Sequence, residues 1–249
     1  LPNLRRVLVC DWGGGTLDVT LIRVDDRDLF EVSTLGLEGI AGDKFDSLLT
    51  DLLVRRFADE NHLNPAQLGI SPRAWDRLAA QAERAKIRLS TSDHAQVTVE
   101  GICRKRGSVL HLDQPVTRAD FESLIVDDVD RALKSIDDAL RVAGINPGAL
   151  DLILMIGGTS LIPLIDGEMR SRFGSRVCTV SNAPTVIAEG AAIVAHNDWQ
   201  PCFANPIKLR LSDDSLYTVF VEKSQLHRET ARKEMTLFCT DQRVGEARV

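Results

Sequence analysis

The sequence predicts an α/β fold, with a sheet and several helices in the same domain. The first observation behind this prediction is an apolar run, residues 7–10, that leads into three consecutive glycines. The second is a largely apolar run, residues 151–156, that ends in Gly157 and Gly158 and is followed by a helical pattern. The third is the helical spacing of apolar residues in the long stretches between these two runs.

Three strands open the chain, near residues 5–11, 17–24 and 29–35, and they are close enough in sequence to form a meander. Apolar residues then recur at helical spacing from Asp43 to Asn61. A second helix is expected from about Pro72 to Leu89. The chain therefore passes from a small sheet to a pair of helices.

A hairpin and a second part of the sheet follow. The alternation of residues 95–100 indicates a strand, and residues 108–112 are its expected hairpin partner. A helix is expected from Thr117 to Ala143, and after it a buried strand at residues 151–156 and a helix from Leu161 to Phe173.

The last fifty residues or so have a different character. Residues 200–206 have the composition of a linker, and residues 207–211 and 216–221 then alternate like strands. A third candidate strand covers residues 235–239. So few strands leave an open edge, and we expect them to be mobile or to pair with another chain.

Composition indicates a folded protein of the reducing cytoplasm. The chain has 249 residues, 44% hydrophobic and 27% charged, which suffices for one large core or two modest ones. Its net charge of −6, its dispersed basic residues and its single tyrosine argue against nucleic acid as the main partner. No apolar run is long enough to span a membrane. The five cysteines lie far apart, which favours free or buried thiols over disulfides or a zinc site.

The first glycine turn has the chemistry of a phosphate site. Gly13, Gly14 and Gly15 allow the backbone to approach a ligand closely, so that their N–H groups can point at phosphate oxygens. Thr16 adds a hydroxyl donor. Asp11 and Asp18 flank the turn and can hold the water shell of Mg²⁺. The alternative is an ordinary hairpin with a glycine turn.

The second glycine turn, Gly157 and Gly158, lies between a strand and a helix, where free amides and the helix dipole favour phosphate. By itself this turn is also typical of a tight strand-to-helix connection. Because each of the two turns follows an apolar strand, we expect them to close on one phosphate chain from two sides.

Five separated motifs resemble those of the seventy-kilodalton heat-shock (DnaK-type) chaperone family, within the actin-like ATPase superfamily. They occur in the family's order and spacing, over roughly residues 5–196, and they are Asp11–Asp18, Gly39–Asp46, Glu83–Ser90, Ile156–Pro163 and Gly190–Ala192.

The resemblance implies an actin-like ATPase (ribonuclease H-like) lobe with a small helical and β rim subdomain, followed by a short β-rich C-terminal segment. Residues 1–199 would be the second lobe of the ATPase domain, with the rim at about 43–116. Residues 200–206 would be a linker, and residues 207–249 the opening strands of a peptide-binding domain.

The same resemblance implies ATP or ADP and Mg²⁺ as cofactors. Both glycine turns would hold the β- and γ-phosphates, and Thr16 would contact the γ-phosphate or the attacking water. Asp11 and Asp18 would orient waters bound to Mg²⁺. Asp11, Thr16 and Asp18 are thus the candidate catalytic residues.

Nucleoside contacts are implied on the second helix. Glu83 and Lys86 share one helix face and would contact the ribose, and Ser90, one turn further, would contact adenine. Gly42 would let the turn before the first helix approach the ribose. The alternatives are a solvated Glu83–Lys86 salt bridge and a plain helix-entry loop capped by Asp43.

Some positions depart from the family pattern. Leu161 stands where many members have an arginine that stacks on adenine, and Ile87 replaces a second such arginine found in some members. Residues 182–185 read Asn-Ala-Pro-Thr where the family usually has Asn-Pro-Asp-Glu, so Pro184 replaces an aspartate. These differences predict weaker or altered base recognition.

The resemblance implies a stress-response chaperone whose ATPase controls the binding of unfolded peptide, with a J-domain cochaperone and a nucleotide exchange factor as partners. The chain starts at Leu1 and contains none of the family's first lobe, so we expect a fragment that is inactive alone. Two alternatives stay open: another actin-like ATPase, or a non-catalytic module that binds nucleotide or a partner.

Overall fold

The computed structural model describes residues 5–221, with gaps at 26–27, 106, 181, 183–184, 198–201, 203–204 and 212. The chain divides into two compact units, Leu1–Val186 and Ile187–Val249, and each is considered by itself. Every predicted site residue lies in the first unit. Among the described helices, none combines the length and the apolar character needed to cross a membrane.

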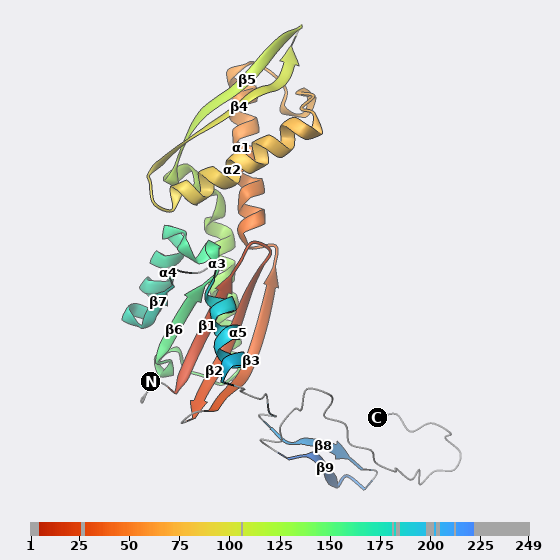
Figure 1. The fold of residues 1–249 in the computed structure, drawn as a ribbon, viewed down its shortest axis with the longest axis vertical. Helices are drawn as coiled ribbons and strands as arrows, with labels where there is room; N and C mark the ends of the chain where they lie inside the picture. Colours follow the sequence, from red (N-terminus) through yellow and green to blue (C-terminus); the bar gives the residue numbers. More distant parts are fainter. Residues whose placement is uncertain are drawn as a thin grey trace, which may run out of the picture. The chain divides into compact units, whose positions relative to one another are not determined.

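The first unit confirms the predicted α/β fold class and contains a mixed five-stranded sheet of order β3-β2-β1-β6-β7 (Figure 1). Strands β1 (Arg6–Trp12), β2 (Thr16–Asp25) and β3 (Asp28–Glu38) form the predicted antiparallel meander. Strand β6 (Leu152–Ile156) lies parallel to β1, and β7 (Val177–Thr179) lies parallel to β6. Because β1 and β6 are parallel neighbours, both glycine turns leave the same edge of the sheet.

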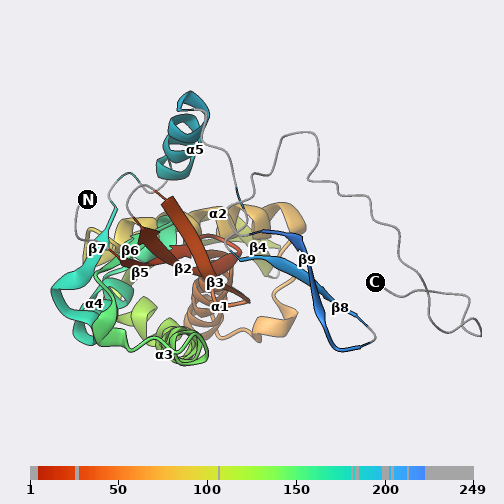
Figure 2. The same cartoon turned by 90° about the horizontal axis from the view of Figure 1, so that it is seen from below.

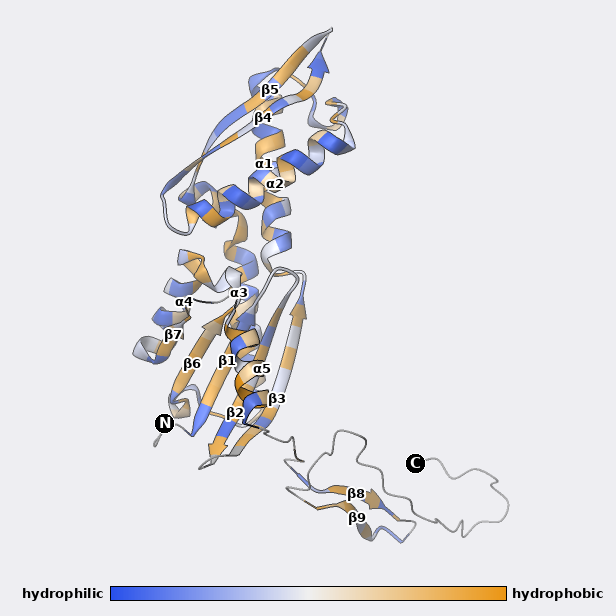
Figure 3. Cartoon of the chain, in the orientation of Figure 1, coloured by the Kyte–Doolittle hydropathy of each residue, from blue (hydrophilic) through white to orange (hydrophobic). Residues whose placement is uncertain are grey.

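Alternation along the strands directs one face of the sheet into the core. Leu8, Cys10 and Trp12 of β1 are buried with Leu17 and Val19 of β2. Strands β1 and β6 are predominantly hydrophobic (Figure 3). Helices α3 (Arg118–Val142) and α4 (Pro163–Phe173) cover one face of the sheet (Figure 2).

Between β3 and α3 the chain forms two helices and a hairpin: α1 (Gly42–Glu60), α2 (Pro72–Leu89), β4 (His94–Lys105) and β5 (Ser108–Thr117). Helix α2 begins where the sequence predicts, because the Ser71 side chain caps it and proline is tolerated at its first position.

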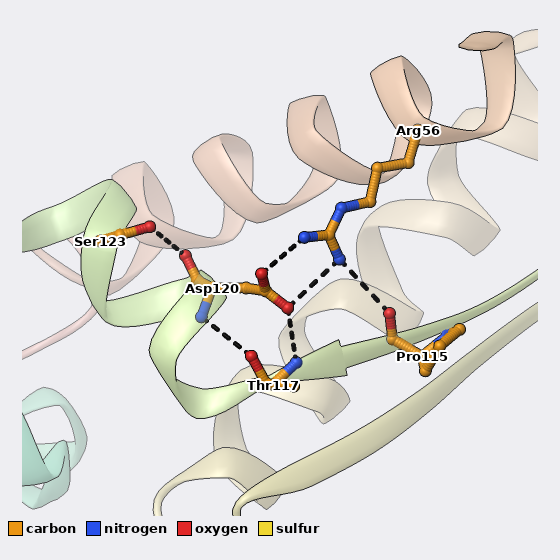
Figure 4. A network of polar contacts seen from close by, with 5 residues as sticks. All are labelled: Arg56, Pro115, Thr117, Asp120 and Ser123. Carbon is orange, nitrogen blue, oxygen red and sulfur yellow. Dashed lines mark hydrogen bonds and ion pairs between the residues drawn. The ribbon is translucent and has the colours of Figure 1, made fainter. Parts of the chain in front are cut away.

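Helix α3 starts at a polar network that joins it to the rim (Figure 4). Thr117 and Asp120 form a capping box, in which each side chain accepts a hydrogen bond from the other's backbone N–H. The Arg56 guanidinium of α1 contacts both carboxylate oxygens of Asp120, at 2.6 Å and 3.3 Å. It also donates to the carbonyl of Pro115, at 3.4 Å. Three elements therefore meet at one carboxylate.

The second unit contains α5 (Val186–His196, which begins at its boundary), β8 (Ile207–Arg210) and β9 (Leu216–Phe220). Strands β8 and β9 pair antiparallel, which confirms the strands predicted there. The predicted strand at residues 235–239 and most of the predicted linker lie outside the described residues.

Candidate functional site

The first glycine turn joins β1 to β2 and packs against the start of α1. The Gly13 N–H donates to the Thr16 carbonyl at 2.9 Å, which closes the turn. The Gly13 carbonyl accepts from the Gly42 N–H at 3.1 Å, and the Gly14 carbonyl accepts from the Asp43 N–H at 2.8 Å. Two successive carbonyls of the turn thus point at α1.

These two hydrogen bonds to α1 fix the direction of the next two amides. In a trans peptide the C=O and the following N–H point in opposite directions, and the described chain contains no cis peptide. The N–H groups of Gly14 and Gly15 therefore point away from α1. Neither has a hydrogen-bond acceptor within the part of the chain that the structure describes, and both glycines are exposed. We call these two N–H groups the amide nest, an arrangement suited to anions.

The second glycine turn lies directly against the first. Gly157 has φ of +82°, and a Cβ there would lie 2.3 Å from the Trp12 carbonyl oxygen and 2.7 Å from a carboxylate oxygen of Asp11. The Thr159 hydroxyl donates to the Gly13 carbonyl at 2.8 Å. The structure therefore brings together the two turns that the sequence singles out.

The connection after β6 differs from the predicted strand, turn and helix. Gly158–Leu161 forms a 3₁₀ turn, and α4 begins only at Pro163. Proline at the first helical position has no N–H to present to a ligand. Any phosphate contact from this turn therefore comes from the 3₁₀ segment rather than from the N-terminus of α4.

Two carboxylates flank the amide nest. Asp11 and Asp18 are directly opposite in the antiparallel pair of β1 and β2, so their side chains share one face of the sheet. Burial, and then the charge of Asp18, raise the pKa of Asp11. The Thr16 hydroxyl donates to Asp18 at 2.8 Å. No cluster of three metal-ligating side chains exists among residues with described positions.

Helix α2 reaches the same region through Lys86. Its ammonium donates to the Asp46 carboxylate at 2.6 Å and to the Gly42 carbonyl at 3.2 Å. The sequence alternative, a Glu83–Lys86 salt bridge, is thus replaced by a pair between α2 and α1. Burial raises the pKa of Asp46, and the charges of Glu83 and Asp43 add to this effect, whereas Lys86 opposes it.

The other predicted nucleoside residues lie close to this pair or further along α2. Glu83 is exposed and lines a pocket of about 400 Å³ between α1 and α2, together with Asp43 and Asp46. Ser90 is the C-cap residue of α2, one turn beyond Lys86. Asp43 does not cap α1, because the N-cap residue is Ala41 and makes no side-chain cap.

A family model described as Hsp70 protein matches residues 3–207 of this chain. The chain belongs to the Hsp70 family. The match includes the five-stranded sheet, the rim elements and both glycine turns. It makes the protein a chaperone of the Hsp70 type, for which a nucleotide is the expected ligand.

The Hsp70 motifs do not identify every residue that shapes this site. The motifs alone predict no role for Asp46 or Thr159, although both residues lie inside them. Their roles depend on partners from other elements, Lys86 and Gly13, so local sequence gives no signal for them. Of the positions expected to depart from the family pattern, Leu161 is 39% exposed and Pro184 lies outside the described residues.

Proposed function

We propose that this Hsp70-type chain binds the phosphates of ATP or ADP at the amide nest, with Mg²⁺ held through water by Asp11 and Asp18. One observation carries the proposal: the two glycine turns abut, and the N–H groups of Gly14 and Gly15 face away from the carbonyls that α1 pins. Amides fixed in this way stabilise negative charge without reorganising when the phosphates arrive.

The side chains beside the nest fit phosphoryl transfer to water. Because the Thr16 hydroxyl donates its proton to Asp18, its oxygen lone pairs are free to accept from a water molecule. Thr16 would therefore orient an attacking water rather than donate to a phosphate oxygen. When bound, Mg²⁺ supplies charge neutralisation on the phosphates, and the role of Asp11 and Asp18 is to orient its water shell.

The nucleoside would extend from Gly42 along α2. Lys86 has three N–H donors, and Asp46 and Gly42 use two of them, so one remains for a ribose hydroxyl. Glu83 supplies an exposed acceptor next to it, and Ser90 would contact adenine. We propose that Gly157 and Gly158 complete the phosphate contacts.

In the complete chaperone, we propose that ATP hydrolysis controls the affinity for unfolded peptide. A J-domain cochaperone would stimulate hydrolysis and an exchange factor would bind the rim, in the cytoplasm and as part of a stress response. Membership of the Hsp70 family supports binding of nucleotide and of substrate peptide, and the two cochaperones extend the proposal. This chain alone would bind nucleotide weakly and would not hydrolyse it, since the family's ATPase site lies between two lobes.

A non-catalytic nucleotide-binding module is the second candidate. The half-exposed Leu161 at the end of the 3₁₀ turn supports it, because leucine lacks the stacking cation that this position supplies in many Hsp70 members. Measurable ATP binding by the longest natural form of the protein, with no phosphate release over many hours, would favour this candidate.

Calorimetric titration of magnesium-ADP into the longest natural form of the protein, and into this chain, tests the proposal. We expect measurable binding by the former and weaker binding by this chain. A Gly14→Val substitution in the longer form should abolish binding, because a Cβ there would lie 3.0 Å from an Asp43 carboxylate oxygen and the branched side chain would push the first turn away from α1. Gly167→Val is the matched control, since Gly167 is exposed on α4 and a Cβ there meets nothing within 4 Å.

Equal affinities of Gly14→Val and the unsubstituted protein would show that the first turn is only a hairpin connection. Tight binding by this chain alone would contradict a phosphate site shared with another lobe. Absence of binding in both forms would remove the nucleotide from the proposal altogether.

A further inference from the structure

We infer that Thr159 is a positioning residue for the phosphate site, whose hydroxyl holds the Gly13 carbonyl and so sets the direction of the Gly14 N–H in the amide nest. The inference rests on the proposed function, because the nest matters only if it binds phosphate. It goes beyond that function by naming the side chain that keeps the nest in its binding orientation.

The Gly13 carbonyl is the point where three elements meet. It accepts the Thr159 hydroxyl at 2.8 Å and the Gly42 N–H at 3.1 Å, so donors from the second turn and from α1 converge on one oxygen. Thr159 is buried, at 5% exposure, so water cannot readily replace it. Within the described chain, Thr159 is the only side-chain donor to this oxygen.

The packing beside this oxygen leaves no room for a side chain at residue 42. A Cβ on Gly42 would lie 2.9 Å from the Thr159 hydroxyl oxygen, 3.2 Å from the Lys86 ammonium and 3.3 Å from the Gly14 Cα. Helix α1 can therefore approach Gly13 and Thr159 only because residue 42 lacks a side chain.

A hydrogen bond that holds the Gly13 carbonyl matters because the turn consists of glycines. A peptide unit between two glycines rotates easily, because neither residue has a Cβ to restrict it. If the unit between Gly13 and Gly14 rotates, its N–H leaves the nest as its carbonyl leaves Thr159 and Gly42. Two donors from different elements oppose this rotation, and Thr159 supplies the shorter hydrogen bond.

The same contacts connect the rim to the nest. Lys86 donates to the Gly42 carbonyl, and the Gly42 N–H donates to the Gly13 carbonyl that Thr159 holds. A movement of α1 with the rim would therefore strain the hydrogen bond from the Gly42 N–H to the Gly13 carbonyl. The hydrogen bond from the Thr159 hydroxyl would remain. We expect Thr159 to keep the nest oriented when the rim moves.

Two substitutions in the longest natural form of the protein test the inference. Thr159→Val keeps the size and β-branching of the side chain and removes the hydroxyl, whereas Thr159→Ser keeps the hydroxyl and removes the methyl group. We expect Thr159→Val to weaken magnesium-ADP binding about tenfold, the effect of losing one buried hydrogen bond. Thr159→Ser should stay within about twofold, because its hydroxyl still reaches Gly13.

Amide hydrogen exchange of Gly42, followed by NMR without nucleotide, provides a second readout. The Gly42 N–H donates to the Gly13 carbonyl, and Thr159→Val leaves that carbonyl free to rotate. The Gly42 amide should therefore exchange several-fold faster in Thr159→Val than in the unsubstituted protein. Ser160→Ala is the control for loss of a buried hydroxyl, because Ser160 is 0% exposed and, among the described residues, its hydroxyl bonds only within its own turn, to Gly157 at 2.7 Å. Gly42 exchange should be unchanged in this control.

The outcomes separate the inference from the proposed function. Unchanged Gly42 exchange in Thr159→Val would overturn the inference whether or not nucleotide binds. Faster exchange with unchanged magnesium-ADP affinity would also overturn it, since the hydrogen bond from Thr159 to Gly13 would then have only a structural role. If the unsubstituted protein fails to bind magnesium-ADP in its longest natural form, the proposed function fails, while the Gly42 measurement still decides whether Thr159 holds Gly13.

Discussion

At the scale of single residues, the site depends on residue 157 being glycine, which has no side chain. A Cβ at this position would lie 2.3 Å from the Trp12 carbonyl oxygen, a backbone atom that cannot move aside without displacing β1. The residue also has φ of +82°, a conformation that costs a residue with a side chain about 1–3 kcal/mol. We therefore expect Gly157→Ala to lower the free energy of unfolding by about 3 kcal/mol or more, measured by urea denaturation.

The neighbouring glycine provides the control for this prediction. A Cβ on Gly158 would meet nothing within 4 Å, and its φ is not positive, so Gly158→Ala should change stability by less than about 1 kcal/mol. Similar losses for both substitutions would contradict the close contact between the second turn and β1.

Residues that act locally were predictable from the sequence. Asp11, Thr16 and Asp18 flank a glycine turn that directly follows an apolar strand, and the structure groups them at that turn. Asp46 was not predictable as the partner of Lys86, because that pair joins two helices forty positions apart in sequence. The spacing of charges along α2 indicated Glu83 as the partner of Lys86 instead. Only the packing of α1 on α2 shows that the partner is Asp46.

At the scale of elements, the start of α3 depends on Asp120. The hydrogen bond from Arg56 is the main cause that lowers the pKa of Asp120 from 3.8 to about 2, although burial opposes it. A lowered carboxylate pKa contributes stability above its ordinary value, and this stability is lost as the pH falls from about 4 towards 2. We expect Asp120→Asn to cost about 1 kcal/mol at pH 7, because solvent screens this partly exposed pair.

Urea denaturation of both proteins between pH 7 and pH 2 checks this expectation. The difference between Asp120→Asn and the unsubstituted chain should shrink as the pH falls towards 2, because the carboxylate is then protonated in the unfolded chain and partly protonated in the folded chain. Asp127→Asn, on the exposed side of the same helix, should show no such difference at any pH. A constant difference across this range would mean that the charge of Asp120 does not contribute.

Strand boundaries show where sequence reasoning about elements fails. The hairpin strands were predicted at residues 95–100 and 108–112, whereas β4 and β5 extend to Lys105 and Thr117. Gly101, with φ of +61°, lies in an irregular part of the pairing that β4 passes through, and Pro115 is accommodated within β5. Glycine and proline usually end strands, so only the pairing itself shows that these strands continue.

At the scale of the first unit, one hydrophobic cluster joins the sheet to the rim. Phe57 of α1 belongs to the same cluster as Leu8 of β1 and Leu78 of α2. We expect Phe57→Ala to lower the free energy of unfolding by about 3–5 kcal/mol. Because the cluster is continuous, hydrogen exchange measured by mass spectrometry should accelerate by similar factors in β1 and in α2.

Val142→Ala is the control, since Val142 is 80% exposed and should change stability by no more than about 0.5 kcal/mol. Faster exchange confined to α1, α2 and the hairpin would show instead that the rim opens independently of the sheet. The mixed fold and its two turns were predictable because they follow from local patterns, whereas this shared core depends on contacts between distant segments.

Trp12 gives the molecule an intrinsic optical sensor beside its glycine turns. Its ring is fully buried, its N–H donates to the Ile40 carbonyl at 2.7 Å, and the next residue along the chain is Gly13. Indole emission responds to polarity and to hydrogen bonding. Movement of the segment before α1 relative to β1 should therefore change the fluorescence spectrum of this residue, without any attached dye.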